Sequence, residues 1–81
     1  PHGHYVVNMI HAAEVAVERG GYMHPRTYYR KLLVEWQGYP SPTQYTWEDE
    51  RKLRRDGVTW QIDDFATASG GNWPRLPRRR F

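Results

Sequence analysis

Residues 32–53 constrain the fold of this chain more than any other stretch. They read LLVEWQGYPSPTQYTWEDERKL, an extended apolar run that breaks at Gly38 and Pro40 and resumes at residues 45–47. Apolar runs separated by a short segment with glycine and proline are typical of two strands joined by a loop. This stretch therefore predicts a β-hairpin.

Two aromatic residues, Trp36 and Tyr39, flank the point where the first strand of this hairpin ends. One interpretation is that both rings cap the end of a small barrel, because most aromatic side chains are buried. The other is an open aromatic box, because the faces of Trp and Tyr attract a bulky, weakly hydrated cation such as methylated ammonium. The two residues alone leave both interpretations open.

The run LLVEWQGYP followed by TWED resembles the signature of the chromodomain family. In that family a strand ends in Trp-x-Gly-aromatic, and a Thr-Trp-Glu returns a few residues later. Residues 5–7, Tyr-Val-Val, resemble the family's first strand, which supplies a third aromatic residue. The resemblance covers residues 4–65 and implies an α+β fold, in which a small curved three-stranded antiparallel sheet forms a chromo/SH3-like partial barrel closed by a C-terminal helix. It assigns residues 4–68 to the domain.

The same resemblance implies a chromatin reader with no enzymatic activity of its own and no cofactor, located in the nucleus. The expected partner is a methylated histone tail, with histone 3 as the expected histone. The methylammonium group would enter a cage of Tyr5, Trp36 and Tyr39. The peptide would add as a strand beside residues 5–7, which we expect to stay loose until it arrives. The expected peptide contacts are Val6, Val7, Gln44, Glu48 and Lys52.

Three positions depart from the family pattern. Asp49 replaces the proline that usually follows Thr-Trp-Glu, and Lys52 replaces an asparagine that commonly holds the peptide backbone. Gln44 lies nearest the position of an acidic residue that many members place beside the cage. Because an amide replaces that carboxylate, we predict binding of the higher methylation states, with trimethylated preferred over monomethylated lysine.

Composition limits the alternatives. The 81 residues correspond to one domain, and the absence of cysteine excludes a disulfide framework or a thiolate zinc site. No apolar run approaches the roughly 20 residues needed to cross a bilayer. The net charge of +3 is concentrated after Thr67, where the chain has four arginines and no acid, so the rest has 12 − 4 = 8 basic against 9 acidic residues. This near-neutral body argues against a broad DNA-binding face. A weak nucleic-acid contact stays open for Arg75, Arg78, Arg79 and Arg80.

Several expectations concern the strands and the first loop. Residues 5–10 and 13–18 predict strands, the first with Tyr5, Val7 and Met9 on one face and Val6 and Ile10 on the other. In the second, valines 15 and 17 are expected to face inward. Residues 27–36 predict the longest strand, with residues 30 and 31 emerging into solvent. The loop over residues 19–26 is longer than usual for the family, and its Tyr22 and Met23 either fold back on the barrel or contact a partner.

The C-terminal half carries further expectations. Trp47 is expected in the core, and the acidic run 48–50 is expected to form a solvated edge facing basic peptide residues, because no histidine, nucleophile or metal pattern accompanies it. Asp56 predicts the start of a helix with an apolar stripe of Val58, Ile62 and Phe65 and with Trp60 off that stripe. We expect packed structure to end at residues 69–71 and residues 73–81 to form a disordered basic tail.

Metal binding is not predicted, because the histidines complete no recognisable ligand spacing with a carboxylate or thiolate. These are His2, His4, His11 and His24. Two other functions stay open. One is a nucleic-acid or targeting module, since chromodomains also occur at the ends of retroelement integrases. The other is a chromoshadow-like domain that dimerises through a helix, for which an exposed Trp60 would be the best indication. We expect a monomer.

Overall fold

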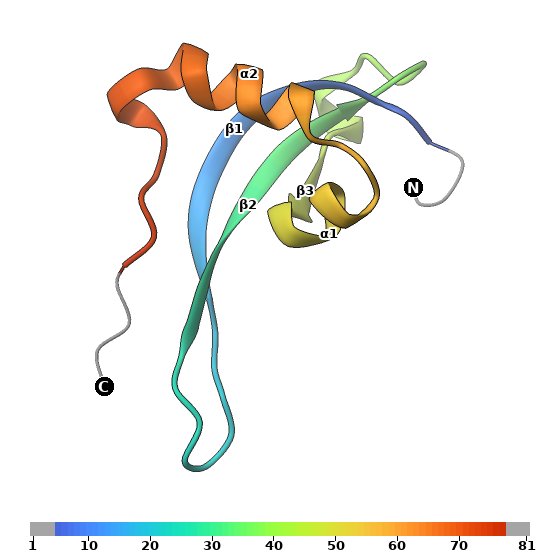
Figure 1. The fold of residues 1–81 in the computed structure, drawn as a ribbon. Coiled ribbons are helices and arrows are strands. Elements are labelled where there is room, and N and C mark those ends of the chain that lie inside the picture. Colours follow the sequence, from blue (N-terminus) through green and yellow to red (C-terminus); the bar gives the residue numbers. More distant parts are fainter. Residues whose placement is uncertain (1–4, 78–81) are drawn as a thin grey trace.

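Strand β2 (Thr27–Trp36) is the central element of a three-stranded antiparallel sheet. The structure is a computed structural model that describes residues 5–77 (Figure 1). β1 (Val7–Glu18) and β3 (Thr46–Asp49) flank β2, helix α1 (Glu50–Arg55) follows β3, and helix α2 (Trp60–Ser69) packs against the sheet. Short 3-10 turns, η1 (Pro42–Gln44) and η2 (Gly70–Asn72), complete the fold. The predicted small α+β fold is thus confirmed, and β2 has the predicted bounds. β2 is not the longest strand as predicted, because β1 has 12 residues against its 10 and joins the two strands predicted over residues 5–10 and 13–18.

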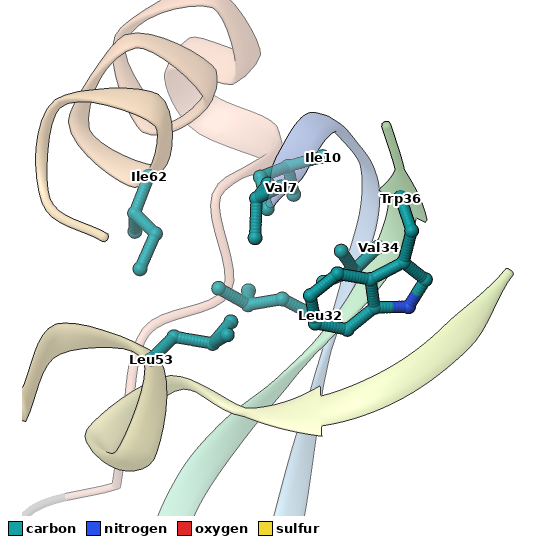
Figure 2. Close-up of a cluster of buried hydrophobic side chains, with 7 residues drawn as sticks. All are labelled: Val7, Ile10, Leu32, Val34, Trp36, Leu53 and Ile62. Carbon is teal, nitrogen blue, oxygen red and sulfur yellow. The ribbon is translucent and has the colours of Figure 1, made fainter. Parts of the chain in front are cut away.

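The core lies on one face of β2. Leu32, Val34 and Trp36 alternate with more exposed residues and are buried, as a strand period of two requires. The other buried apolar side chains come from β1, α1 and α2, and they close over this face (Figure 2): Val7, Ile10, Leu53 and Ile62. Val58 and Phe65 pack against the same cluster, so the three predicted residues all face the core, but only Ile62 and Phe65 lie on α2, because Val58 precedes it.

The inward face of β1 differs from the predicted one. The pairing register shifts between Val7 and Met9 and again between Ile10 and Ala12. Such bulges place extra residues in one strand and rotate the side chains that follow. Val7 and Ile10 therefore both face the core, while Met9 is half exposed. The expectation that Val7 and Met9 share a face opposite Ile10 was wrong.

Beyond the core, β1 and β2 continue as a two-stranded arm that projects from the body (Figure 1). Its last pair is Glu18 with Thr27. Val15 and Val17 lie on this arm and are 40% and 45% exposed, so their predicted burial was wrong. The reason is that α1 and α2 cover the sheet nearer its other end, as Figure 1 shows.

Helix α1 was not predicted and changes the assignment of Asp56. The side chain of Asp49 caps α1, because its carboxylate accepts a hydrogen bond from the N–H of Arg51 at 2.8 Å. The N–H of Asp56 donates to carbonyls of α1, and Gly57 follows with a positive φ of 91°. These are features of a helix end. Asp56 therefore ends α1, and α2 begins at Trp60 after Thr59.

A buried glutamate links the sheet, α1 and the C-terminal segment. Glu50 is 6% exposed, and its carboxylate accepts from Arg30 Nε at 2.6 Å and from Arg54 Nε at 2.9 Å. Arg30 also donates to the carbonyl of Pro74 at 2.9 Å, and its guanidinium lies 4.5 Å from the ring centroid of Trp73. Burial of Glu50 and Arg30 contradicts the predicted solvated edge and the predicted solvent position of residue 30. Lys31 is exposed as expected.

Trp73 and Pro74 pack on the domain, whereas the sequence predicted that packed structure ends at residues 69–71 and that residues 73–81 are disordered. The Trp73 ring lies 6.2 Å from that of Phe65, centroid to centroid, so the segment buries an aromatic group. Arg75 is exposed, and Arg78, Arg79 and Arg80 lie outside the described residues. Within residues 5–77, no helix is long and apolar enough to span a membrane.

Trp47 is 42% exposed, so its predicted burial was wrong. It pairs with Leu33, whereas the neighbouring Leu32 and Val34 point to the core. Because paired residues share a face of the sheet, Trp47 lies on the outer face.

Candidate functional site

Three aromatic rings meet at the end of the sheet opposite the arm. Tyr5 precedes β1, Trp36 ends β2, and Tyr39 follows the turn after β2. The Tyr5 centroid lies 6.4 Å from that of Trp36, at an interplanar angle of 71°, and 5.5 Å from that of Tyr39, at 55°. The rings are therefore inclined to one another and form walls rather than a stack.

Backbone pairing explains why Tyr5 reaches the other two rings. Val7 pairs with Trp36, and the N–H of Gln37 donates to the carbonyl of Val6 at 2.8 Å. These contacts hold residues 5–7 beside the end of β2. We expected this segment to be loose until a peptide arrives; here it is already placed against β2.

The turn after β2 depends on a glycine. The N–H of Tyr39 donates to the carbonyl of Trp36 at 2.9 Å, and Gly38 has a φ of 87°. A positive φ at the third position of such a turn defines type II, which favours glycine there. The sequence Trp-Gln-Gly-Tyr thus returns Tyr39 to the side of Trp36.

The rings enclose an open cavity of about 320 Å³, lined by Tyr5, Trp36, Tyr39 and Gln44. Trp36 forms a buried wall at 6% exposure, whereas Tyr5 and Tyr39 are 42% and 38% exposed. The indole N–H of Trp36 donates to Thr46 Oγ1 at 2.7 Å, which fixes the orientation of this ring. Two exposed aromatic walls and one rigid one leave ring faces available to a ligand.

The walls of the cavity are uncharged. No carboxylate of the described residues lines it, and Gln44 contributes an amide. A hydrogen bond with the Tyr5 hydroxyl raises the pKa of Tyr39 above its ordinary value of 10.0. Tyr39 therefore remains a neutral phenol at physiological pH, and attraction for a cation would come from the ring faces.

A polar cluster on the outer face of the sheet holds the loop that carries Gln44. The hydroxyl of Tyr45 donates to Glu35 Oε1 at 3.2 Å and to the carbonyl of Pro40 at 3.3 Å. His11 stacks on Tyr45 with centroids 4.4 Å apart, and its Nε2 lies 2.7 Å from Glu35 Oε1. The hydrogen bond from His11, and then that from Asn8, lower the pKa of Glu35.

Sequence reasoning missed this cluster. His11 and Glu35 are 24 residues apart and carry no shared motif. The shifted β1–β2 register, which pairs Met9 with Glu35, is what brings them together. Burial also raises the pKa of Tyr45 above its ordinary value, so Tyr45 stays protonated and able to donate.

The predicted peptide contacts are only partly gathered at the cavity. Gln44 lines it, and Val6 is exposed beside it, but Val7 is a core residue and offers only its main chain. Glu48 is half-buried in β3. Lys52 instead lines a polar depression that includes Tyr29, which lies seven residues from Trp36 on β2, or about 23 Å along a strand. The structure does not bring Lys52 to the aromatic rings.

Of the three acidic residues 48–50 predicted to form a solvated edge, only Glu48 has no described arginine partner. Asp49 binds Arg51, whose Nη2 lies 2.7 Å from its Oδ2, and hydrogen bonds from Arg51 lower the pKa of Asp49. Glu50 is buried with two arginines, as described above. Neither of these carboxylates is available to a basic peptide.

Among residues 5–77, no three His, Asp or Glu side chains are placed to hold a metal ion. His11 lies against Glu35, and His24 is exposed at the tip of the arm. His2 and His4 lie outside the described residues.

The chain matches no family model, no curated protein and no solved structure.

Proposed function

We propose that this domain binds a methylated lysine side chain in the cavity formed by Tyr5, Trp36 and Tyr39. The supporting observation is that rings from two distant segments converge on one open cavity. If the rings only capped a barrel, all three would be buried, yet Tyr5 and Tyr39 are each about two-fifths exposed. A methylammonium group is a weakly hydrated cation and gains about 0.5 to 2 kcal/mol from each well-placed aromatic face.

The proposed ligand is a histone tail peptide that adds along β1. β1 is an edge strand, because β2 lies on one side of it and no described strand lies on the other. A peptide can therefore pair with the main chain around residues 6–8, in the mode in which a bound strand extends a sheet. Glu48 is the one residue of the acidic run without a described ion pair, but β3 lies on the far side of β2 from β1, so its charge would act on a basic peptide only at long range. According to this proposal, the domain acts in the nucleus, in association with chromatin, and it binds its ligand without catalysing a reaction.

The methylation state follows from the lining of the cavity. A lysine with fewer methyl groups retains N–H donors that need acceptors, and Gln44 offers only a neutral amide oxygen. Trimethylammonium has no N–H and loses nothing in this environment. The domain is expected to bind trimethylated lysine more tightly than monomethylated lysine, and equal affinities would contradict this reasoning.

Tyr5→Ala and Tyr39→Ala test the cavity, in titrations with histone 3 tail peptides that differ only in methylation. Each should weaken binding of the methylated peptide roughly tenfold, because one cation–π wall is lost. Trp36→Ala is less informative, because Trp36 is also a core residue. Trp60→Ala is the matched control, since Trp60 is 65% exposed and lies on α2 away from the cavity. Methylation-independent binding, or equal losses for the control, would contradict the proposal.

A second candidate is self-association through α2. Trp60, which the sequence placed only off the apolar stripe, is 65% exposed, and with Met9 and Phe65 it lines a hollow of about 320 Å³ between α2 and β1. An exposed tryptophan is the feature that favours a helix-mediated dimer. Sedimentation equilibrium separates the two: we expect a monomer, and a dimer that Trp60→Ala dissociates would favour the second candidate.

A further inference from the structure

The tip of the arm, residues 19–26, carries the most exposed large apolar side chains of the described chain. Tyr22 is 92% and Met23 84% exposed. The sequence left open whether these residues fold back on the barrel, and the structure shows that they do not. The turn between β1 and β2 lies at the free end of the arm, away from α1 and α2 (Figure 1). On β2, Trp36 lies nine residues after Thr27, or about 30 Å along a strand.

The tip is a defined turn rather than an arbitrary loop. The N–H of His24 donates to the carbonyl of Gly21 at 2.9 Å, which closes the turn around Tyr22 and Met23. A Cβ on Gly20 would lie 2.6 Å from the Cβ of His24, so only glycine fits there. Met23 has a φ of 69°, a region that non-glycine residues rarely adopt. The turn therefore presents Tyr22 and Met23 outward at the cost of local strain, and such strain is concentrated at functional positions.

The charge of the tip is one-sided. Arg19 and Arg26 are exposed on opposite sides of the turn, His24 lies between them, and residues 19–26 contain no acid. Neither arginine has a described ion pair within residues 5–77. The adjacent carboxylate, Glu18, lies 3.5 Å from Arg51, so its charge is partly compensated. The tip is thus a cationic rim around an exposed aromatic and a flexible apolar side chain.

We propose that this tip is a nucleic-acid contact, in which Arg19 and Arg26 bind backbone phosphates while Tyr22 and Met23 contact bases. Charge complementarity selects a polyanion as the partner, because guanidinium groups bind phosphates in a bidentate manner. The exposed ring of Tyr22 indicates that this polyanion is a nucleic acid, because bases stack on such rings. This site is separate from the proposed methyl-lysine cavity and does not depend on it.

The geometry fits both forms of nucleic acid. Arg19 and Arg26 directly adjoin the last β1–β2 pair, Glu18 with Thr27, whose members lie about 5 Å apart, so the two arginines start from neighbouring points of the ribbon. A two-stranded ribbon such as this arm fits the major groove of duplex DNA, where its tip would reach the base edges. In a single strand, Tyr22 would stack on one unpaired base. Both share phosphate and base-face chemistry, and the probes below distinguish them.

The test uses the full 81-residue chain and two fluorescein-labelled probes, a mixed-sequence duplex and one of its strands, followed by fluorescence anisotropy. Tyr22→Ala should weaken binding about fivefold or more without changing its salt dependence, because a stacking contact is lost. Arg19→Gln with Arg26→Gln should lower the slope of log affinity against log salt by about 1.8 on the duplex, since each phosphate contact contributes about 0.9. The probe that depends more strongly on Tyr22 identifies the bound form.

Matched variants exclude a general charge effect. Lys31→Gln with Arg55→Gln removes the same charge from exposed residues outside the tip and should change affinity by about twofold at most. Tip variants should retain methyl-peptide binding, and Tyr5→Ala should retain nucleic-acid binding, so failure of one site is distinguishable from failure of the other. Absence of binding to both probes at low salt would overturn the inference. So would binding that is unchanged in Tyr22→Ala, or binding abolished only when Arg78, Arg79 and Arg80 are replaced by Gln.

Discussion

Glu50→Gln is expected to destabilise the domain substantially although it removes no atom of the core. The Glu50 side chain is 8% exposed and accepts from Arg30, which is 18% exposed, and from Arg54, which is 36% exposed. Glutamine keeps the shape but removes the charge and presents an NH₂ group to one of two arginine donors. Two cations then share a buried site with one neutral acceptor.

The magnitude follows from how far these groups are desolvated. Removing one partner of a fully buried pair costs about 3 to 5 kcal/mol, whereas an exposed pair contributes about 0 to 1. Arg54 is partly solvated, so about 2 kcal/mol is expected for Glu50→Gln. A domain of this length has a free energy of unfolding of about 4 to 12 kcal/mol. The variant should therefore still fold, with a Tm lower by about 8 to 16 °C.

Thermal and urea unfolding monitored by circular dichroism measure this loss. Glu48→Gln is the matched control, because Glu48 lies two residues away and has no described ion pair; a change within about 0.5 kcal/mol is expected. Amide exchange should accelerate at residues 70–74 in Glu50→Gln, because Arg30 also holds the carbonyl of Pro74. Equal effects of the two substitutions would refute the role assigned to Glu50.

Two further predictions concern the site and the acid response. Thr46→Val leaves the indole N–H of buried Trp36 unpaired, so it should lower the free energy of unfolding by about 1 to 3 kcal/mol and weaken methyl-peptide binding. Thr46→Ser keeps the hydroxyl acceptor and should preserve stability and binding. Equal stability of the two variants in urea would contradict this. Glu35 and Asp49 have folded pKa values below the ordinary 4.5 and 3.8, so their stabilisation is present above those values and is lost as pH falls through the folded ones. Unfolding measured from about pH 6 to 3 should show falling stability, with a shallower fall in Glu35→Gln; an unchanged pH profile in that variant would contradict it.

The sequence predicted the elements whose pattern is local. β2 has its predicted bounds because β-formers fill residues 27–36 and the Gly38 turn ends them. Ile62 and Phe65 share a face of α2 as helical spacing predicts, whereas Val58 reaches the same core from the segment before the helix. The three aromatic residues could be grouped because the resemblance supplied Tyr5 as the third aromatic residue beside Trp36 and Tyr39.

What failed depends on register and on partners distant in sequence. The bulges in β1 turn both Val7 and Ile10 inward. The alternation of apolar and polar residues does not predict where such bulges occur. Trp47 is exposed because it pairs with Leu33 and therefore lies on the outer face of the sheet. The four residues of β3 do not by themselves indicate which residue of β2 each of them pairs with. In the sequence, Glu50 is one of three consecutive acidic residues and nothing indicates its burial. Its burial depends on Arg30, which is distant in the sequence. α1 is different: Asp49 before ERKLRR is a recognisable helix start, and that signal was overlooked.

We propose that the cavity of Tyr5, Trp36 and Tyr39 recognises a cation by its charge as well as its shape. The most direct measurement compares a histone 3 tail peptide carrying trimethyllysine with the same peptide carrying its neutral isostere, in which carbon replaces the ammonium nitrogen. Both fill the cavity equally, but only the first gains cation–π attraction. Calorimetric titration should give an affinity roughly tenfold or more higher for the charged peptide. Equal affinities would show that the rings form only an apolar pocket and would contradict the account.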